Sequence, residues 1–188
     1  MEHLMIDFET LSTDNMPALL SIGAVAFDVY ELHTFKEFYR NIDIQSSIDL
    51  GGTVSASTFL WWLNQNHEAR QKIVKQENPT NIKLVFEELS EFYKDNKVKY
   101  VWGHGATFDV NIAENYFNKL RIKVPWQYYN ARDTRTLFDL TKITRTKFEG
   151  TKHNALDDAK MQATDVVRCY VGFKNLMDRL KNNSVKEE

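Results

Sequence analysis

The segment from Leu19 to Phe27 constrains the fold of this chain most, because it is apolar along almost its whole length. A short run of this kind is typical of a strand buried inside a sheet, and it falls well below the ~18 apolar residues that a membrane-spanning helix needs. The segments from Leu4 to Phe8 and from His33 to Arg40 indicate further strands before and after it. We therefore predict a three-stranded meander at the start of the chain.

Apolar residues at helical spacing begin after this meander. They predict a helix from Thr80 to Asn96, a buried strand from Val98 to Trp102, a second helix from Phe108 to Leu120, and a long last helix from about Ala155 to Leu180. Helices and strands that alternate in this way predict an α/β fold, in which a mixed sheet is flanked by helices.

Length and composition fit one domain. The chain has 188 residues, of which 43% are hydrophobic, and this is enough for one sizeable core but short for two. No repeat or Pro/Gly-rich linker divides the sequence, so we expect a single domain over residues 1–181 and a charged C-terminal tail over residues 182–188. Cys169 has no partner for an internal disulfide, and the sequence lacks a signal-peptide pattern, so a cytoplasmic location without membrane contact is expected.

The net charge of -2 disfavours a protein that holds nucleic acid by bulk electrostatics alone. Any phosphate binding must therefore be local. Divalent ions bound to carboxylates can turn an acidic pocket into one that attracts phosphate, so the charge is compatible with a metal enzyme.

Asp7 and Glu9 form the first candidate site. Residues two apart on a strand share a face, so the two acids point the same way while Phe8 points to the opposite layer. Two carboxylates this close repel each other unless a cation lies between them, and Mg²⁺ or Mn²⁺ would serve. An acid pair on a solvated strand face is common, but the apolar neighbours Met5 and Ile6 indicate a central strand.

Asp109 is the second candidate. It follows a predicted strand and lies close to a helix start, where an α/β sheet tends to bind its ligands. The alternative is an acid that is favoured there only by the helix macrodipole.

His153 and Asp158 form the third candidate. Positions five apart on a helix are separated by about 140°, so His153 is expected in the loop before the last helix, with Asn154 able to cap that helix. His104 and Asp109 show the same spacing, so the spacing alone is poor evidence. For His104, which ends a probable strand, we expect a surface or hydrogen-bonded residue.

Together these segments resemble, in order, the three exonuclease motifs of the DEDDh (DnaQ-like) family: Ile6-Asp7-Phe8-Glu9-Thr10, then Asp109, then His153-Asn154-Ala155-Leu156-Asp157-Asp158-Ala159. The segments Ser57–Trp62, Glu68–Arg70 and Arg132–Thr136, with Gln65, are similar to a branch that contains phage exonuclease A (DexA) and RNase AS-like exoribonucleases. The resemblance covers about Leu4 to Tyr170.

This resemblance implies an RNase H-like core, two divalent ions (Mg²⁺ or Mn²⁺), and removal of 5′-mononucleotides from a 3′ end. It makes four acids the metal ligands: Asp7, Glu9, Asp109 and Asp158. His153 would be the general base, because a histidine with an ordinary pKa of about 6.5 can accept the proton of water at neutral pH. The tyrosine subclass of the family would carry Tyr at the position of Asn154.

Substrate contacts are expected from six further residues: Thr10, Leu11, Trp61, Phe108, Arg132 and Arg135. Thr10 and Leu11 follow the acid pair, and in the family the backbone of this stretch approaches the terminal nucleotide while an apolar side chain is wedged between bases. For Leu11, plain core packing is the alternative. Trp61 and Trp62 are expected as helix neighbours, so at most one faces the core fully while the other can stack on a base. Basic residues outnumber acids from Arg132 to Lys152, which indicates either a solvated face or a guide for phosphates.

We expect a metal-dependent 3′-5′ exonuclease that acts on single-stranded DNA ends. An exoribonuclease with the same mechanism is the first alternative, and a non-catalytic nucleic-acid-binding domain is a more distant one. A homodimer is also hypothesised, since dimers are common among the relatives. The host cytoplasm would be the location if the chain is encoded by a phage.

Overall fold

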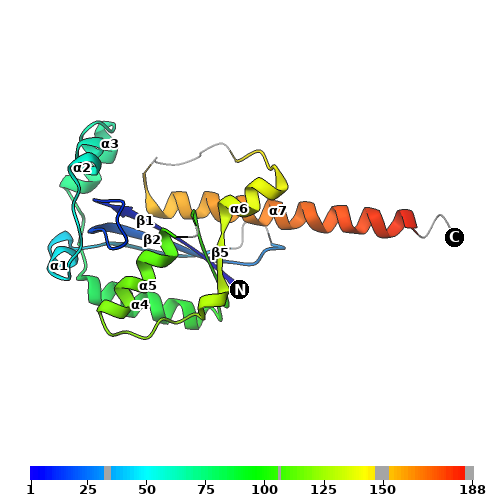
Figure 1. The fold of residues 1–188 in the computed structure, drawn as a ribbon, viewed down its shortest axis with the longest axis horizontal. Coiled ribbons are helices and arrows are strands. Elements are labelled where there is room, and N and C mark those ends of the chain that lie inside the picture. Colours follow the sequence, from blue (N-terminus) through cyan, green and yellow to red (C-terminus); the bar gives the residue numbers. More distant parts are fainter. Residues whose placement is uncertain (32–34, 106, 147–152, 185–188) are drawn as a thin grey trace.

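The computed structural model describes residues 1–31, 35–105, 107–146 and 153–184 (Figure 1). Within these residues one sheet has five strands, in the order β3-β2-β1-β4-β5. The strands are β1 (His3–Thr10), β2 (Leu19–Phe27), β3 (Phe35–Asn41), β4 (Tyr100–Gly103) and β5 (Ala131–Asp133). β2 is antiparallel to β1 and β3, whereas β4 is parallel to β1 and β5, so the predicted mixed sheet is confirmed.

The strands expected from the sequence are present with small shifts at their ends. β2 has the predicted bounds, and all nine of its residues are buried, because strands flank it on both sides and helices cover both faces. β1 continues past the expected end at Phe8 to Thr10. Residues 33 and 34 of the third predicted strand lie outside the described residues, and the remainder falls in β3.

One face of the sheet packs against α4 (Ile82–Asp95) and α5 (Asp109–Lys119), which lie together on one side in Figure 1. Leu4, Ile6 and Phe8 of β1 join buried residues of these two helices in one apolar cluster. Both helices were predicted, with ends that differ by one or two residues from the expected bounds.

The other face packs against α7 (Ala155–Ser184), the predicted long last helix. Met5 of β1 lies in a second buried cluster with Ala159, Ala163 and Val166 of α7. Since alternate strand residues share a face, residues 7 and 9 of β1 lie on this α7 side as well.

Trp61 and Trp62 were expected on a helix, but no bounds were predicted for several short elements: α1 (Ile44–Asp49), α2 (Ala56–Leu63), α3 (His67–Val74), the 3₁₀ helix η1 (Tyr128–Asn130), β5 and α6 (Thr134–Thr141). The four α-helices among them each begin at a capping side chain, which accepts a hydrogen bond from the backbone of the first turn. The caps are Asp43, Ser55, Asn66 and Asp133. In helices this short, the capping residue indicates the helix in the sequence more clearly than the spacing of apolar residues does.

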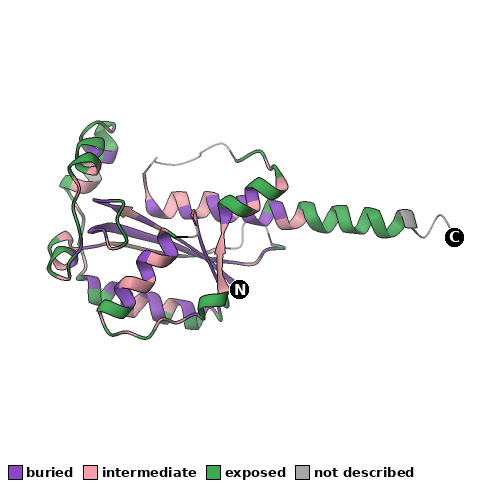
Figure 2. Ribbon diagram, in the orientation of Figure 1, coloured by how far each residue is buried: buried purple, intermediate pink, exposed green. Residues whose placement is uncertain are grey.

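The last turns of α7 project from the body and are exposed (Figures 1 and 2). The helix continues past Leu180 to Ser184, so residues 182–184 of the expected tail are helical, and residues 185–188 lie outside the described residues. Within the described ranges, no helix combines the length and hydropathy needed to span a bilayer.

Candidate active site

Asp7 and Glu9 are partly buried on the α7 side of β1. Their register partners on β2 are Gly23 and Ser21. One partner has no side chain and the other has a small one, so the sheet leaves room for the start of α7 beside the two acids.

The start of α7 brings a third carboxylate to this pair. Asn154 caps the helix as predicted, because its Oδ1 accepts hydrogen bonds from the backbone N–H groups of Leu156 and Asp157, each at 3.1 Å. Asp158 then lies in the first turn of α7. One carboxylate oxygen from each of Asp7, Glu9 and Asp158 lies within 4.8 Å of the others.

The electrostatics of this group favour a cation. Burial raises the pKa of Asp7 well above its ordinary value, and the negative charges of Asp109, Glu9 and Asp158 raise it further. A divalent ion would relieve this repulsion, and hard cations such as Mg²⁺ prefer oxygen ligands. The donor set and its spacing therefore fit a divalent metal.

Asp109 lies next to this group, as the first residue of α5. Asp109 is 2% exposed, and its carboxylate accepts two hydrogen bonds from backbone N–H groups, that of Phe8 at 3.3 Å and that of His104 at 3.0 Å. Burial raises the pKa of Asp109 to about 6, although both backbone donors and the charge of Arg135 act in the opposite direction. Among the described residues, Asp109 is not one of the three acids within 4.8 Å of one another.

His153 lies in the loop before α7, as expected. Its φ of 60° is left-handed, a conformation that is unusual for a residue with a side chain and that is often found at functional sites. The ring packs edge-to-face against Trp61 and Trp62, with centroid distances of 4.8 Å and 5.9 Å. His153 and Glu9 both line one small pocket of about 20 Å³.

The side chain of His104 is hydrogen-bonded within the fold, as expected. Its Nδ1 shares a hydrogen bond of 2.8 Å with the hydroxyl of Thr134 at the start of α6. Burial, followed by the charges of Arg145 and Arg135, lowers the pKa of His104 to about 4.

A cleft of about 420 Å³ opens beside Glu9, a volume within the usual range for ligand sites. Its walls come from β1, the loop after β1, α2 and the residue before α5. The lining residues are Phe8, Glu9, Thr10, Thr13, Ser57, Thr58, Trp61, Trp62 and Phe108. Three of the predicted substrate contacts, Thr10, Trp61 and Phe108, thus share one cleft.

The two neighbouring tryptophans of α2 have different environments, as expected. Trp62 is 4% exposed, and its Nε1 donates a hydrogen bond of 2.9 Å to the carbonyl oxygen of Thr10. Trp61 is 43% exposed and faces both the cleft and His153. Trp62 therefore fixes the end of β1, while part of the Trp61 ring stays exposed.

Leu11 is the predicted substrate contact that the structure places in the core. It is 7% exposed and packs in an apolar cluster with Ala18, Leu20, Trp62 and Ala69. This corresponds to the alternative of core packing. Leu11 is not one of the described residues that line the cleft.

The two predicted arginines lie in different places. Arg135 lies close to Asp109 and His104, and its positive charge lowers the pKa of both side chains. Its Cζ would lie 4.0 Å from a Cβ built on Gly105. Arg132 stacks on the ring of Tyr100 at 4.6 Å and donates hydrogen bonds to the carbonyl oxygens of Tyr129 and Ala131.

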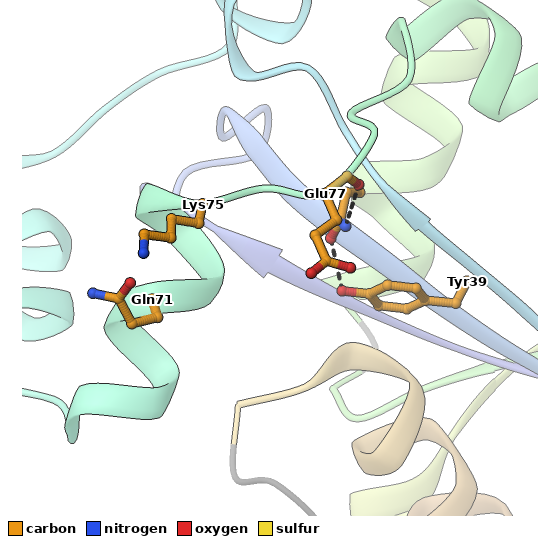
Figure 3. A pocket seen from close by; sticks show the side chains of 5 residues that line it. Tyr39, Gln71, Lys75 and Glu77 are labelled. Carbon is orange, nitrogen blue, oxygen red and sulfur yellow. Dashed lines mark hydrogen bonds between the residues drawn. The ribbon is translucent and has the colours of Figure 1, made fainter.

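A second recess, of about 390 Å³, lies between β3 and α3 (Figure 3). The residues that line it all carry a polar group: Tyr39, Asn41, Gln71, Lys75 and Glu77. The hydroxyl of Tyr39 donates to Asn41, and the amide of Asn41 donates to the carbonyl oxygen of Glu77. Tyr39 and Asn41 also line the small pocket that contains Glu9 and His153, so this recess adjoins the acids.

Sequence reasoning missed these recess residues, and it also missed Gln162. The amide Nε2 of Gln162 donates a hydrogen bond of 2.8 Å to Oδ1 of Asp7. The sequence signal that could have found it is its position four residues after Asp158, which puts both side chains on one face of α7.

Comparison with known proteins gives this geometry a context. The model of the 3′-5′ exoribonuclease Rv2179c-like domain family matches residues 2–170. An exodeoxyribonuclease of Enterobacteria phage T4 is 23% identical to this chain, over 75% of this chain and 72% of the phage protein.

Solved exonuclease structures have a similar fold. Exonuclease I of E. coli, in its zinc-bound complex with single-stranded DNA, matches with a TM-score of 0.56 and 15% identity, over 96% of this chain and 42% of that chain. A full-length 3′-exonuclease matches with a TM-score of 0.50 and 13% identity, over 90% of this chain and 81% of that chain. The chain thus spans less than half of exonuclease I, and the likeness confirms the predicted RNase H-like fold.

Proposed function

This chain belongs to the 3′-5′ exoribonuclease Rv2179c-like domain family, and from this premise we propose that it removes 5′-mononucleotides from the 3′ end of single-stranded nucleic acid, with DNA favoured. Membership in the family confirms the resemblance to the DEDDh exonucleases, and the chain is a 3′-5′ exonuclease. The observation that carries the proposal is the approach of Asp7, Glu9 and Asp158 to one another at the edge of an aromatic cleft.

The acids are proposed as metal ligands. Asp7, Glu9 and Asp158 would hold divalent ions, and Asp109, which adjoins Asp7, would complete a site for two ions of Mg²⁺ or Mn²⁺. When bound, such ions supply Lewis-acid stabilisation of the charge on a phosphodiester and lower the pKa of water.

His153 is proposed as the general base. It shares a small pocket with Glu9, and its ring packs edge-to-face against that of Trp61. A neutral imidazole in this place can accept the proton of the attacking water. The structural environment of His104, whose Nδ1 is engaged by Thr134, supports this choice between the two histidines.

The cleft is proposed to receive the 3′-terminal nucleotide. Trp61 and Phe108 provide ring surfaces on which a base can stack, while Thr10 brings backbone groups close to the sugar. Arg135, near Asp109, is proposed to contact a phosphate. For Leu11 and Arg132 a substrate contact stays a prediction, because their observed contacts are with the core and with Tyr100.

The choice of sugar separates the leading proposal from its alternative. A relative from phage T4 is an exodeoxyribonuclease, and the E. coli exonuclease I structure contains single-stranded DNA, which supports DNA. The family description names an exoribonuclease, which supports RNA as the second candidate.

Matched DNA and RNA oligonucleotides test the proposal directly. With Mg²⁺ or Mn²⁺ supplied, we expect progressive shortening from the 3′ end, release of 5′-mononucleotides, and faster cleavage of DNA. A blocked 3′ end should prevent the reaction. Cleavage of RNA alone would contradict the preference for DNA and leave the mechanism in place.

Two variants test the site itself. Asp7→Ala should abolish cleavage, because it removes a ligand from the centre of the acid group. Asp95→Ala is the matched control, since Asp95 is an exposed acid at the end of α4. Activity of Asp7→Ala at the level of the control would contradict the assignment.

A homodimer is proposed through the projecting part of α7. Phe173, Leu176, Met177 and Leu180 recur at helical spacing and are 45–55% exposed, and a groove of about 340 Å³ beside them lies between α6 and α7. Exposed apolar stripes of this kind are typical of protein–protein contacts. Light scattering should give twice the chain mass, and Leu176→Lys should reduce it to one; a monomeric wild-type protein would contradict the proposal.

We propose that the exonuclease unit comprises residues 1–181, and the location in the cytoplasm, or in the host cytoplasm for a phage protein, stays a prediction.

A further inference from the structure

Gln162 connects α7 to β1 at the acid group. It lies one helical turn after Asp158, and its Nε2 donates a hydrogen bond of 2.8 Å to Oδ1 of Asp7, a residue 155 positions away in the sequence. The residue is 4% exposed, so this contact is shielded from bulk water. Gln162 thus contacts a proposed metal ligand and shares a helix face with another.

The chemistry of an amide suits this position. An ionised carboxylate can only accept hydrogen bonds, and it has about four lone-pair sites for them. One bond from Gln162 therefore restricts the orientation of Asp7 and leaves its other sites for a cation. A lysine or arginine would also donate, but its charge would neutralise the acids and compete with a metal ion.

The other end of the same amide lacks a partner. Oε1 of Gln162 is buried and has no hydrogen-bond partner among the residues that the structure describes. Turning the amide over would not help, because Oε1 would then face the acceptor oxygen of Asp7. A buried acceptor of this kind calls for a donor that is not part of the chain.

A water molecule on a bound divalent ion is a donor of the required kind. Mg²⁺ in proteins usually keeps several of its waters, and the charge of the ion makes the hydrogens of those waters strong donors. Because the two polar atoms of Gln162 belong to one amide group, its Oε1 lies beside the acids that would hold the ion.

We propose that Gln162 is a positioning residue of the metal centre: its Nε2 holds Asp7 in the orientation that binds the ion, and its Oε1 accepts a hydrogen bond from a water on that ion. The inference rests on the proposed function, because it takes the acid group to be a metal site. Partners of metal ligands that act in this way typically change metal affinity by about 10–100-fold when they are removed.

Metal affinity measured without substrate tests this role. In calorimetric titrations with Mn²⁺ alone, Gln162→Leu should bind about 10–100-fold more weakly than the wild type. Gln45→Leu is the matched control, because Gln45 donates the same type of bond, 2.8 Å to Oδ1 of Asp49, on the exposed side of α1. The control should bind Mn²⁺ as the wild type does.

Thermal unfolding in EDTA separates positioning from a purely structural role. If Gln162→Leu unfolds at a lower temperature but binds Mn²⁺ as tightly as the wild type, the inference is overturned. Gln162→Met, which keeps an unbranched side chain of similar length, gives the same comparison if the leucine variant does not fold. A wild-type protein that neither binds Mn²⁺ nor cleaves oligonucleotides overturns the proposed function as well, whereas an active wild type matched by both Gln162 variants overturns this inference alone.

Discussion

Gly23 of β2 lies directly against the backbone of Ala155, the first residue of α7. A Cβ built on Gly23 would lie 2.2 Å from the carbonyl carbon of Ala155, which is closer than real Cβ contacts allow. Gly23 is also the register partner of Asp7. The absence of a side chain at residue 23 therefore lets α7 begin close to the sheet, at the level where Asp158 can approach Asp7.

Gly23→Ala should consequently damage both stability and activity. The added methyl group forces α7 away from β2, and overpacking of this kind costs about 1–3 kcal/mol, or more where backbone must move. We expect a lower free energy of unfolding in urea and a large loss of cleavage and Mn²⁺ binding.

Gly172→Ala is the matched control, since nothing lies within 4 Å of a Cβ at this helical position. It should raise stability by about 0.5–1 kcal/mol and leave cleavage unchanged. Wild-type cleavage by Gly23→Ala would show that this close approach does not set the positions of the acids.

The sequence predicted those parts of the site that depend on local periodicity. The alternation of β1 puts Asp7 and Glu9 on one face and Phe8 on the other, as found. The same local reasoning placed His153 before the last helix and Asn154 at its cap, because a cap depends on neighbours in the chain.

The parts that depend on distant contacts were not predictable in this way. Gln162 looks like any polar residue of a long helix until Asp7, 155 positions away, is placed beside it. Arg132 and Arg135 were both expected to contact the substrate, but Asp133 caps α6 through the backbone N–H of Arg135. The strand and the helix that meet at this cap give the two arginines different surroundings.

The two histidines that precede an acid by five positions should respond differently to substitution. His153→Ala should slow cleavage by about 10²–10⁴-fold, the usual contribution of a general base, with little change in Mn²⁺ affinity. His104→Ala is the comparison; it should have a smaller effect, because the hydrogen bond to Asp109 comes from the backbone of residue 104. Single-turnover rates at saturating Mn²⁺ measure both, and a larger loss in His104→Ala would reverse the assignment.

The two tryptophans of α2 should separate binding from stability. Trp61→Ala should weaken oligonucleotide binding by about 1–3 kcal/mol, because an exposed ring available for stacking is lost. Trp62→Phe should instead lower the free energy of unfolding by about 1–3 kcal/mol, since the carbonyl oxygen of Thr10 loses its buried donor. Fluorescence anisotropy and urea unfolding measure the two effects, and the reverse pattern would contradict these roles.

His3 should make the protein sensitive to acid at a place remote from the acids of the site. It is 5% exposed, and its Nδ1 accepts a hydrogen bond of 2.9 Å from Nε1 of Trp102, which requires an unprotonated nitrogen. Burial lowers the pKa of His3 from 6.5 to about 4. The charge of Asp28 acts to raise this pKa, and that of Arg132 lowers it further. The folded protein therefore resists protonation of this ring.

The sign of the pH effect follows from these values. Between pH 6.5 and about 4 the unfolded chain binds the proton of His3 and the folded chain does not, so the free energy of unfolding falls as the pH is lowered through this window. The free energy of unfolding that the neutral His3 contributes is fully present above pH 6.5 and amounts to about 3 kcal/mol. His3→Gln keeps an acceptor for Trp102 without a titratable group, so it should lose less stability than the wild type between pH 7 and pH 4.5 in urea unfolding with EDTA. Equal losses in the two proteins would mean that other groups, among them His104 with its similarly lowered pKa, account for the acid sensitivity.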